Sequence, residues 1–418
     1  MKKGTKLRFQ IHNILYDIHN YNKNLDDTTI KKNIYKHKNE DIAFINNVCL
    51  NSMRFYFQIK KIINKYVKKR VRAHEEILLV SGITQIVYLD FKEYAVIDCS
   101  VEVAKKLNIY HGFINAELKN ISINKKKLLQ TQINYSDLPI WFQKETLNLN
   151  KKKKKSFLKN YNQEPDLHVV FKNENKTKIF KEDLELSSKK SGFLIEKKII
   201  ENLSFYKEGN WWIQDFSSSL PLLNVDTNLL DGKNIDLCSA PGGKSFQILS
   251  NNKKIILNDK NKFRLKRVNE NLKRLKFKAN ILNKSILDFD EKEKYDFIIL
   301  DAPCSAVGTI RRNPEIFFKK QQPNLKSLIS TQSKMLKKAS DLLKKNGILL
   351  FMVCSFLQKE TTNQISNFLL NNKDFIIKDT FIKSEHQKFL KEKFMYTLPS
   401  DYKGYRIDGY FATYLKKI

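Results

Sequence analysis

The second half of the chain alternates strand-length apolar runs with helical segments, and this alternation constrains the fold most. The apolar runs are Asn234–Cys238, Lys254–Asn258, Phe297–Leu300 and Ile348–Val353. Segments with helical periodicity lie between them, at Lys262–Leu275 and Gln332–Lys344. Apolar strands that alternate with helices are typical of βαβ units, in which helices cover both faces of a parallel sheet. We therefore expect a doubly covered α/β domain of the Rossmann-like kind over residues 221–418.

The N-terminal part has a different pattern, which predicts helices only. Leu7, Ile11, Ile14, Leu15 and Ile18 recur at helical spacing, and two further apolar helices are expected over Ile42–Ile63 and Glu75–Leu89. We expect residues 1–130 to form an all-α module that binds RNA and performs no chemistry.

Residues 131–220 connect these two parts. Short apolar strands such as Leu167–Phe171 alternate there with charged turns, which predicts a linker and a small α+β subdomain. The run of five lysines at 151–155 indicates a linker or a solvated arm, and a direct contact with phosphate groups stays open.

The composition favours a polyanionic partner and a reducing compartment. Among 418 residues, 77 Lys and Arg against 44 Asp and Glu give a net charge of +33, which suits RNA. Part of that charge is compositional, because Lys, Asn and Ile are abundant throughout. Five cysteines without CxxC spacing and seven histidines favour neither disulfides nor a metal site. No apolar run reaches the roughly 20 residues of a membrane span, so we expect a cytoplasmic monomer.

A glycine-containing turn, Ala240-Pro241-Gly242-Gly243-Lys244, follows the first predicted strand and opens a helix. Glycines allow close approach of the backbone to a ligand, and the helix start leaves N–H groups free. Asp259 ends the second strand, where an acid can hold ribose hydroxyls. Since the turn lacks a Walker A pattern, a ribose-bearing cofactor such as S-adenosylmethionine is favoured over a triphosphate. The alternative is a plain strand–helix turn.

Two cysteines follow two of the predicted strands. Cys304 stands in Asp301-Ala302-Pro303-Cys304-Ser305, and Cys354 stands in Val353-Cys354-Ser355. Active sites of open α/β sheets lie beyond the carboxyl ends of the strands, so Asp301, Cys304 and Cys354 should share one crevice. A thiolate that adds to carbon 6 of cytosine makes carbon 5 nucleophilic enough to attack a methyl sulfonium, and a second thiol can help to resolve the adduct. Cysteines 49, 99 and 238 are expected to pack instead.

These motifs together resemble the NOL1/NOP2/Sun family of RNA 5-methylcytosine methyltransferases. The resemblance rests on residues 238–244, 301–305, Ile310-Arg311-Arg312-Asn313-Pro314-Glu315 and 353–355. Gly209 with Ile213–Ser217 is similar to the start of the family's catalytic domain, and Asp408–Ala412 is similar to its terminal strand. The helical region around Ala95–Leu118 resembles the NusB-like RNA-binding domain of the bacterial 16S rRNA branch. The resemblance covers nearly the whole chain.

The resemblance implies a fold, a cofactor, a substrate and a set of site residues. It implies a Rossmann-like S-adenosylmethionine-dependent methyltransferase domain behind a NusB-like domain, acting on 16S rRNA. Cys354 would be the nucleophile, Cys304 would assist product release, and Asp301 would hydrogen-bond or protonate the cytosine ring, with Lys244 nearby. The cofactor would be held by Cys238, Ser239, Ala240, Pro241, Gly242, Gly243, Lys244, Asp259, Ser285 and Asp301.

The chain departs from the family pattern at a few positions. Ser285 stands where the family has an acid that holds the adenine side of the cofactor, and Asp288 is the possible substitute. Val353, Ser239 and Asn313 replace a Thr, an Ala and a His, and none of these replacements removes a group that performs chemistry.

Several alternatives stay open at this point. Arg311 and Arg312 suit phosphates or stacking but are equally compatible with plain surface charge. An amino-group methyltransferase would carry an Asp/Asn-Pro-Pro motif with an aromatic residue in place of Asp-Ala-Pro-Cys. A DNA cytosine-C5 enzyme would use the cysteine of Pro-Cys as its nucleophile. An RNA-binding assembly factor with a vestigial catalytic domain would not transfer methyl groups at all.

Overall fold

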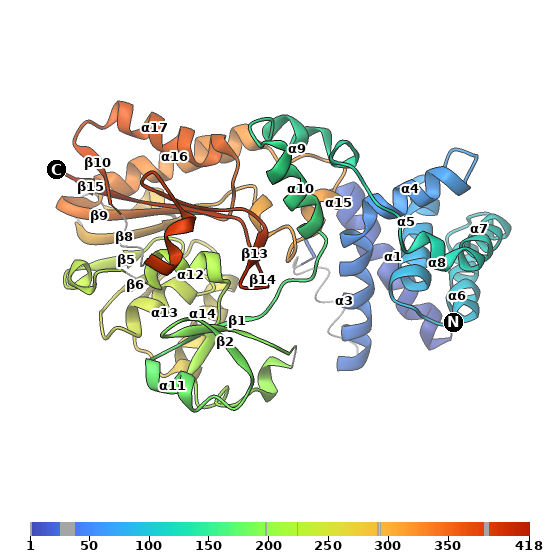
Figure 1. Ribbon diagram of the computed structural model, residues 1–418, viewed down its shortest axis with the longest axis horizontal. Helices are drawn as coiled ribbons and strands as arrows, with labels where there is room; N and C mark the ends of the chain where they lie inside the picture. The colour runs from blue at the N-terminus through green and yellow to red at the C-terminus, as the bar shows by residue number, and fades with distance from the viewer. Residues whose placement is uncertain are drawn as a thin grey trace. The chain divides into compact units, whose positions relative to one another are not determined.

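The computed structural model describes residues 2–25, 38–196, 199–223, 225–290, 292, 294–379 and 384–418. The chain divides into two compact units (Figure 1). A helical unit comprises residues 1–163 and 310–323, and an α/β unit comprises residues 164–309 and 324–418.

The helical unit is built from short and medium helices. Its longer helices are α1 (Lys3–Tyr21), α3 (Asn39–Arg54), α4 (Tyr56–Tyr66), α5 (Ala73–Ile83), α6 (Glu93–Lys106) and α7 (His111–Ile123). The single helix expected over Ile42–Ile63 is wrong, because Phe55 leaves helical geometry between α3 and α4 and stacks on Tyr88 at a ring distance of 4.2 Å. The helix expected over Glu75–Leu89 is α5 followed by a π-turn, Thr84–Tyr88.

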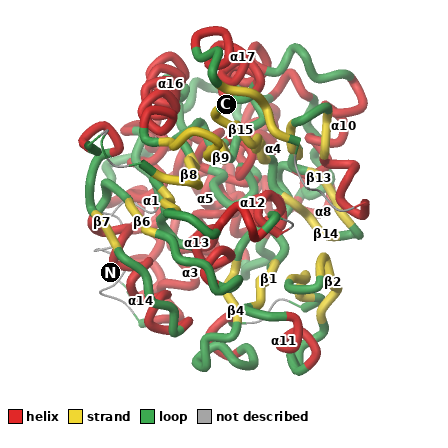
Figure 2. Tube along the Cα trace, turned by 90° about the vertical axis from the view of Figure 1, so that its left-hand side faces the viewer, coloured by secondary structure: helices red, strands yellow, loops and turns green. Residues whose placement is uncertain are grey.

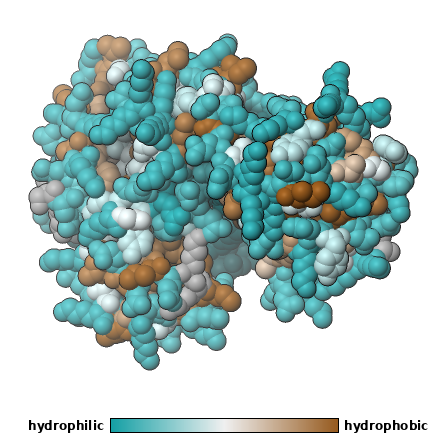
Figure 3. Space-filling model, turned by 45° about the vertical axis from the view of Figure 1, so that its right-hand side comes forward, coloured by the Kyte–Doolittle hydropathy of each residue, from teal (hydrophilic) through white to brown (hydrophobic). Residues whose placement is uncertain are grey.

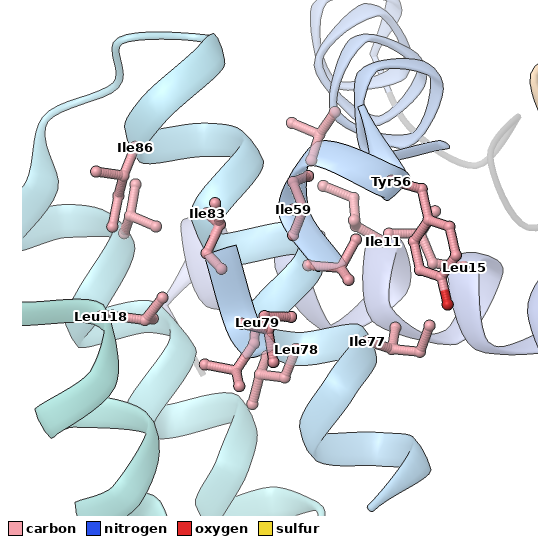
Figure 4. Close-up of a cluster of buried hydrophobic side chains, with 14 of the residues drawn as sticks. Ile11, Leu15, Tyr56, Ile59, Ile77, Leu78, Leu79, Ile83, Ile86 and Leu118 are labelled. Atoms are coloured by element: carbon pink, nitrogen blue, oxygen red, sulfur yellow. The ribbon is translucent and has the colours of Figure 1, made fainter. Parts of the chain in front are cut away.

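Helix α5 lies at the centre of this unit. Its side chains from Ile77 to Ile83 are all buried, as a helix that is apolar on every side requires. Figure 4 shows them packed against Ile11 and Leu15 of α1, Ile59 of α4 and Leu118 of α7. At Gly82 a Cβ atom would come within 2.8 Å of Leu118, so the glycine permits the close approach of α5 and α7. This core explains the apolar periodicity of the N-terminal sequence.

A segment from the second half of the sequence completes the helical unit. Helix α15 (Glu315–Phe318) contributes Phe318, which is 1% exposed and joins the helical core. His19 bonds the carbonyl of Phe318 at 2.5 Å, and Phe317 packs edge-on against Phe142 at 4.8 Å. The chain therefore leaves the α/β unit after Thr309 and returns at Asn324, which contiguous sequence boundaries do not anticipate.

The lysine run is helical rather than an extended linker. Lys151–Lys155 forms the first half of α10 (Lys151–Asn160), and the side chain of Asn150 caps this helix by accepting a hydrogen bond from the Lys153 amide at 2.9 Å. Phe157 and Asn160 are the buried residues of α10, whereas most of the lysines are exposed. The expectation of a linker was wrong because a capped helix start and a buried Phe157 outweigh the repulsion of the lysines.

The α/β unit begins with a small antiparallel sheet in the order β2-β3-β1-β4. Its strands are β1 (His168–Phe171), β2 (Leu184–Ser188), β3 (Ser191–Leu194) and β4 (Trp211–Ile213), with α11 (Glu174–Lys178) after β1. This is the expected α+β subdomain. Gly209 turns the chain into β4 with a φ of +69°, and a Cβ there would come within 1.8 Å of the Arg274 carbonyl oxygen.

The large sheet has the order β11-β12-β15-β9-β8-β5-β6-β7, with β10 paired to β15. Parallel pairing joins β5 (Asn234–Asp236), β6 (Ile256–Asn258), β7 (Ile281–Leu282), β8 (Tyr295–Asp301) and β9 (Leu343–Val353). The remaining strands, which pair antiparallel, are β10 (Phe375–Lys378), β11 (Leu390–Lys391), β12 (Phe394–Thr397) and β15 (Tyr410–Lys417). The Rossmann-like expectation is confirmed, with an antiparallel edge added.

Helices cover both faces of this sheet. In Figures 1 and 2, α16 (Leu325–Asp341) and α17 (Thr362–Asn371) lie on one side, and α12 (Phe216–Leu223), α13 (Gly243–Leu249) and α14 (Lys262–Leu275) lie on the other. Helix α14 has the predicted bounds. The helix predicted over Gln332–Lys344 begins earlier, at Leu325, where Asn324 caps it, and Lys344 falls on β9 instead.

The surface is polar on the face that Figure 3 shows, with scattered apolar side chains. None of the helices within the described ranges combines the length and the apolar composition that a membrane span requires.

Candidate active site

A cavity of about 280 Å³ opens at the carboxyl ends of the parallel strands. Residues after β5, β6, β7, β8 and β9 line it, together with α16: Leu237, Cys238, Asp259, Lys260, Arg264, Lys284, Ser285, Ile286, Leu287, Asp301, Ala302, Pro303, Cys304, Thr331, Met335 and Cys354. This is the crevice in which open α/β sheets bind ligands.

The two cysteines meet at one side of this cavity. Strands β8 and β9 are parallel neighbours, with Asp301 opposite Met352. The chains beyond them bring the Sγ atoms of Cys304 and Cys354 to 3.3 Å, and both thiols are free. The amide of Gly308 donates to the Cys354 carbonyl at 3.1 Å, so backbone contacts as well as side chains hold the two strand ends together.

Asp301 lies between a cation and a phenol. Its Oδ2 accepts from the Lys244 ammonium at 2.6 Å, and its Oδ1 accepts from the Tyr410 hydroxyl at 2.9 Å. Burial, helped by the negative charges of Asp301 and Cys354, raises the pKa of Tyr410 well above its ordinary value, so the phenol stays a donor. The sequence analysis missed Tyr410, and its only signal was its position inside the Asp408–Ala412 motif.

The electrostatics of the cysteine pair are unequal. The pKa of Cys304 lies well above its ordinary value, first because its thiol hydrogen-bonds Cys354, and then because burial and the charges of Cys354 and Glu360 disfavour a second anion. Burial alone would lower the pKa of Lys244, but Asp301, Asp236 and Cys354 together raise it. Cys304 is therefore a thiol, and a fixed cation is electrostatically coupled to Cys354.

The glycine turn is held by acids from the neighbouring strands. Ser245 donates to Asp236 at 2.7 Å, and burial raises the pKa of Asp236 to about 7. Asp259 accepts from the Ala240 amide at 3.4 Å and pairs with Arg264 at 3.6 Å. These bonds hold the turn in place beside the site.

The residues predicted to hold a cofactor divide into two groups. Cys238, Asp259, Ser285 and Asp301 line the cavity, whereas Ser239, Ala240, Pro241, Gly242, Gly243 and Lys244 form the turn behind it. Gly242 caps α13 with a φ of +112°, while a Cβ on Gly243 would face Gln214 at 3.1 Å rather than the cavity.

Of the two candidate residues after β7, one lines the cavity. Ser285 lines the cavity and accepts from the Leu287 amide, whereas the exposed Asp288 is not among the lining residues.

This donor set fits S-adenosylmethionine. Leu237, Ile286, Leu287 and Met335 offer apolar surface for a flat base. The carboxylates of Asp259 and Asp301 offer acceptors for ribose hydroxyls and a negative field for a sulfonium. Among the described residues, no group of His, Cys, Asp or Glu is arranged to hold a metal ion.

Two arginines that were candidates for RNA contact have different environments. Arg311 is fully buried and belongs to the helical unit, where its carbonyl accepts from Arg54 at 3.2 Å. Its guanidinium is therefore inaccessible to a phosphate in this structure, because the 310–323 segment packs into the helical core. Arg312 is partly exposed.

Comparison with known families assigns both parts of the chain. Residues 226–416 match the family described as 16S rRNA methyltransferase RsmB/F, and residues 5–122 match the NusB family. Ribosomal RNA small subunit methyltransferase B of Pasteurella multocida is 28% identical over 387 residues, covering 83% of each chain. The probable enzyme of the same name from Coxiella burnetii is 29% identical over 360 residues, covering 78% of this chain and 82% of that one.

Solved structures share the fold at low sequence identity. The crystal structure of PH0851 superposes with a TM-score of 0.72 at 18% identity and covers 100% of this chain and 99% of its own. The structure of NSun6 from Pyrococcus horikoshii with SFG has a TM-score of 0.54 at 17% identity, covering 67% of this chain and 98% of that one.

Proposed function

Because the chain belongs, through residues 226–416, to the RsmB/F family of rRNA methyltransferases, we propose that it methylates carbon 5 of a cytosine in 16S rRNA through a covalent adduct with Cys354. The protein is an S-adenosylmethionine-dependent rRNA methyltransferase. Beyond this activity, we propose that carbon 5 of cytosine is the methylated atom, that 16S rRNA is the substrate, and that the two thiols have different roles. The observation that carries it is the pair of sulfurs 3.3 Å apart at neighbouring strand ends, beside the Lys244–Asp301 ion pair.

The chain's own groups suit the addition step. A cytosine that is single-stranded or flipped out of a helix enters the crevice, because stacking shields carbon 6. The thiolate of Cys354 forms a bond to carbon 6 as the 5,6 double bond opens, and Asp301 stabilises the charge that develops on the ring. S-adenosylmethionine, when bound, supplies the electrophilic methyl group that carbon 5 takes.

Release of the product reverses the addition. Loss of the carbon-5 proton to a base re-forms the double bond and breaks the bond between sulfur and carbon 6. The Cys304 thiol assists by hydrogen-bonding the departing Cys354 thiolate, a role that the 3.3 Å separation and the raised pKa of Cys304 both support.

The proposal also assigns parts of the chain. Residues 1–130 form the NusB-like RNA-binding domain, residues 131–220 include the small α+β subdomain, and residues 221–418 form the catalytic domain. Cys238, Asp259, Ser285 and Asp301 hold the cofactor within the cavity, and residues 239–244 shape it. Arg312 stays a candidate for RNA contact, whereas the burial of Arg311 argues against it.

Methyl transfer to rRNA tests this assignment. Unmodified 16S rRNA and small subunits are incubated with the full chain and S-adenosylmethionine labelled in its methyl group, and the product nucleoside is identified by mass spectrometry. The proposal expects labelled 5-methylcytosine at one position. Label on an exocyclic amine would indicate an amino-group methyltransferase. No label on rRNA under conditions in which the cofactor binds would favour an assembly factor.

A further inference from the structure

One buried carboxylate joins the two cysteine-bearing strand ends. Glu360 lies in the short turn Gln358–Glu360 after β9, and its side chain is fully buried. One of its oxygens accepts from the Ser305 amide at 2.8 Å, and the other accepts from the Ser355 hydroxyl at 2.6 Å and from the Ser305 hydroxyl. These serines directly follow Cys304 and Cys354, so a single side chain reaches the residue next to each thiol.

A neutral amide completes this hub. Gln332 of α16 donates to Glu360 at 3.1 Å and to the Pro303 carbonyl at 2.9 Å, which ties the residue before Cys304 to the same group. The four groups that donate to Glu360, the Ser305 amide and hydroxyl, the Ser355 hydroxyl and the Gln332 amide, are all neutral. A buried carboxylate without a cation among these partners is costly to keep unless its position serves the site.

The Cys304 loop needs such a hold more than the Cys354 end does. Ala306, two residues after Cys304, has a φ of +57°, which is unfavourable for an alanine. The loop therefore depends on bonds from outside it, and those to Ser305 come from Glu360 and, at 3.3 Å, from the Ser355 hydroxyl.

Glu360 also contributes to the charge balance around the sulfurs. The side chains that are electrostatically linked to one or both sulfurs are Lys244, Tyr410 and Glu360. The negative charge of Glu360 helps to raise the pKa of Cys304. Lys244 is the cation that is electrostatically coupled to Cys354.

We propose that Glu360 is a positioning residue that aligns the two sulfurs. This alignment stands on the hydrogen bonds of Glu360 to Ser305 and Ser355, and its kinetic consequence rests on the proposed function above. Because Glu360 contacts neither cysteine side chain directly, its influence passes through Ser305, Ser355 and the local field.

The decisive measurement is site-resolved alkylation without RNA. The full chain and Glu360→Gln are treated briefly with iodoacetamide between pH 6 and pH 9, and modification of Cys304 and Cys354 is quantified by peptide mass spectrometry. We expect the ratio of Cys304 to Cys354 labelling near pH 7.5 to rise at least fivefold in Glu360→Gln, because a neutral amide no longer opposes a Cys304 thiolate. An unchanged ratio would overturn the proposal.

Matched variants separate positioning from folding. Ser355→Ala removes the bond from Glu360 to the Cys354 end, whereas Ser305→Ala removes only the hydroxyl bond to the Cys304 end and leaves the Ser305 amide bond in place. Ser355→Ala therefore keeps the experiment decisive if Glu360→Gln fails to fold. Thr361→Val is the control, because Thr361 is adjacent and fully buried, and its hydroxyl bonds the Leu357 carbonyl at 2.9 Å within the same turn. We expect Thr361→Val to keep the wild-type ratio, and a shift there as large as in Glu360→Gln would also overturn the proposal.

Turnover gives the second readout. Glu360→Gln should lower kcat for methyl transfer about tenfold while KM for S-adenosylmethionine stays unchanged, since hydrogen bonds to charged groups are worth about that factor. If the alkylation ratio shifts but the wild-type chain transfers no methyl group to rRNA, the proposed function fails and the role of Glu360 stands. If methylation is seen and the ratio does not shift, Glu360 alone is wrongly assigned.

Discussion

The two cysteine-bearing strand ends resemble each other in sequence but differ in their electrostatic surroundings. Each has a Cys-Ser pair after a central parallel strand, and both serines bond the same carboxylate, Glu360. The Cys354 end is coupled to the Lys244 cation, whereas the Cys304 end faces the charge of Glu360 and stays a thiol. The difference teaches that two like motifs can be distinguished by the charges around them, here Lys244 near Cys354 and Glu360 near Cys304.

The backbones at these two ends also differ. Cys354 follows the last residue of the eleven-residue strand β9 directly. Cys304 is separated from β8 by Ala302 and Pro303, and its loop continues through Ala306 at positive φ. A sheet therefore fixes Cys354, whereas side-chain bonds fix the Cys304 loop. This suits the attacking role proposed for Cys354 and the assisting role proposed for Cys304.

Removing the cation should affect one thiol far more than the other. In Lys244→Gln we expect alkylation of Cys354 and single-turnover methyl transfer to slow by about 10- to 100-fold, because the cation that is electrostatically coupled to Cys354 and paired with Asp301 is lost. Alkylation of Cys304 should change little. Lys253→Gln, which removes a surface ion pair with Asp231, is the control. Equal slowing at both cysteines would break the comparison.

Tyr410 connects the two strand ends. It lies on β15, which pairs with β9, and its hydroxyl donates to Asp301 on β8. Tyr410→Phe should lower kcat about tenfold with KM for the cofactor unchanged, because one hydrogen bond to a charged group is lost. Tyr414→Phe is a matched control on the same strand, where a buried hydroxyl bonds the Pro221 carbonyl at 2.6 Å. If both variants lose the same activity, the effect is structural rather than specific to Asp301.

A second pair of like residues extends the comparison to stability. Asp301 has a cationic partner, whereas Asp236 is bonded by Ser245 and the Cys238 amide, and burial raises its pKa to about 7. A carboxyl group whose pKa is raised in the folded state stabilises that state when it is protonated. The contribution of Asp236 is therefore complete below about pH 4 and is lost as the pH rises to about 7. The free energy of unfolding should therefore fall by at most about 4 kcal/mol across that window on account of Asp236.

Asp236→Asn isolates this contribution. The free energy of unfolding is measured in urea from pH 4 to pH 8 for Asp236→Asn and the wild type. The variant should become more stable relative to the wild type as the pH rises. Parallel curves for the two proteins would show that Asp236 ionises normally.

The sequence allowed prediction of the parts that depend on backbone pattern. The apolar runs placed β5, β6, β8 and β9, and the strand-end positions of Cys304 and Cys354 followed from parallel pairing. The bounds of α14 were predictable because its apolar face is strictly periodic. The break at Phe55 and the course of residues 310–323 were not, since both depend on tertiary packing of aromatic side chains that no local pattern encodes.

The site was predictable as a set of reactive groups but not as a network. Asp301, Lys244 and the cysteines stand in recognisable motifs. Tyr410 lies 109 residues along the chain from Asp301, the carboxylate that it bonds, and Glu360 lies outside the recognised motifs. Both residue types are common on any surface. Only the fold brings the Tyr410 hydroxyl to 2.9 Å from Asp301. Long-range side-chain partners were therefore the part that sequence reasoning missed.

The division of labour between the thiols is tested most directly by trapping the adduct. Cys354→Ala and Cys304→Ala are each incubated with labelled 16S rRNA and S-adenosylmethionine and resolved by denaturing electrophoresis. The account predicts neither product nor adduct for Cys354→Ala, and a denaturation-resistant protein–RNA complex carrying 5-methylcytosine for Cys304→Ala. The opposite pattern would make Cys304 the nucleophile, and activity without adduct in both variants would contradict covalent catalysis altogether.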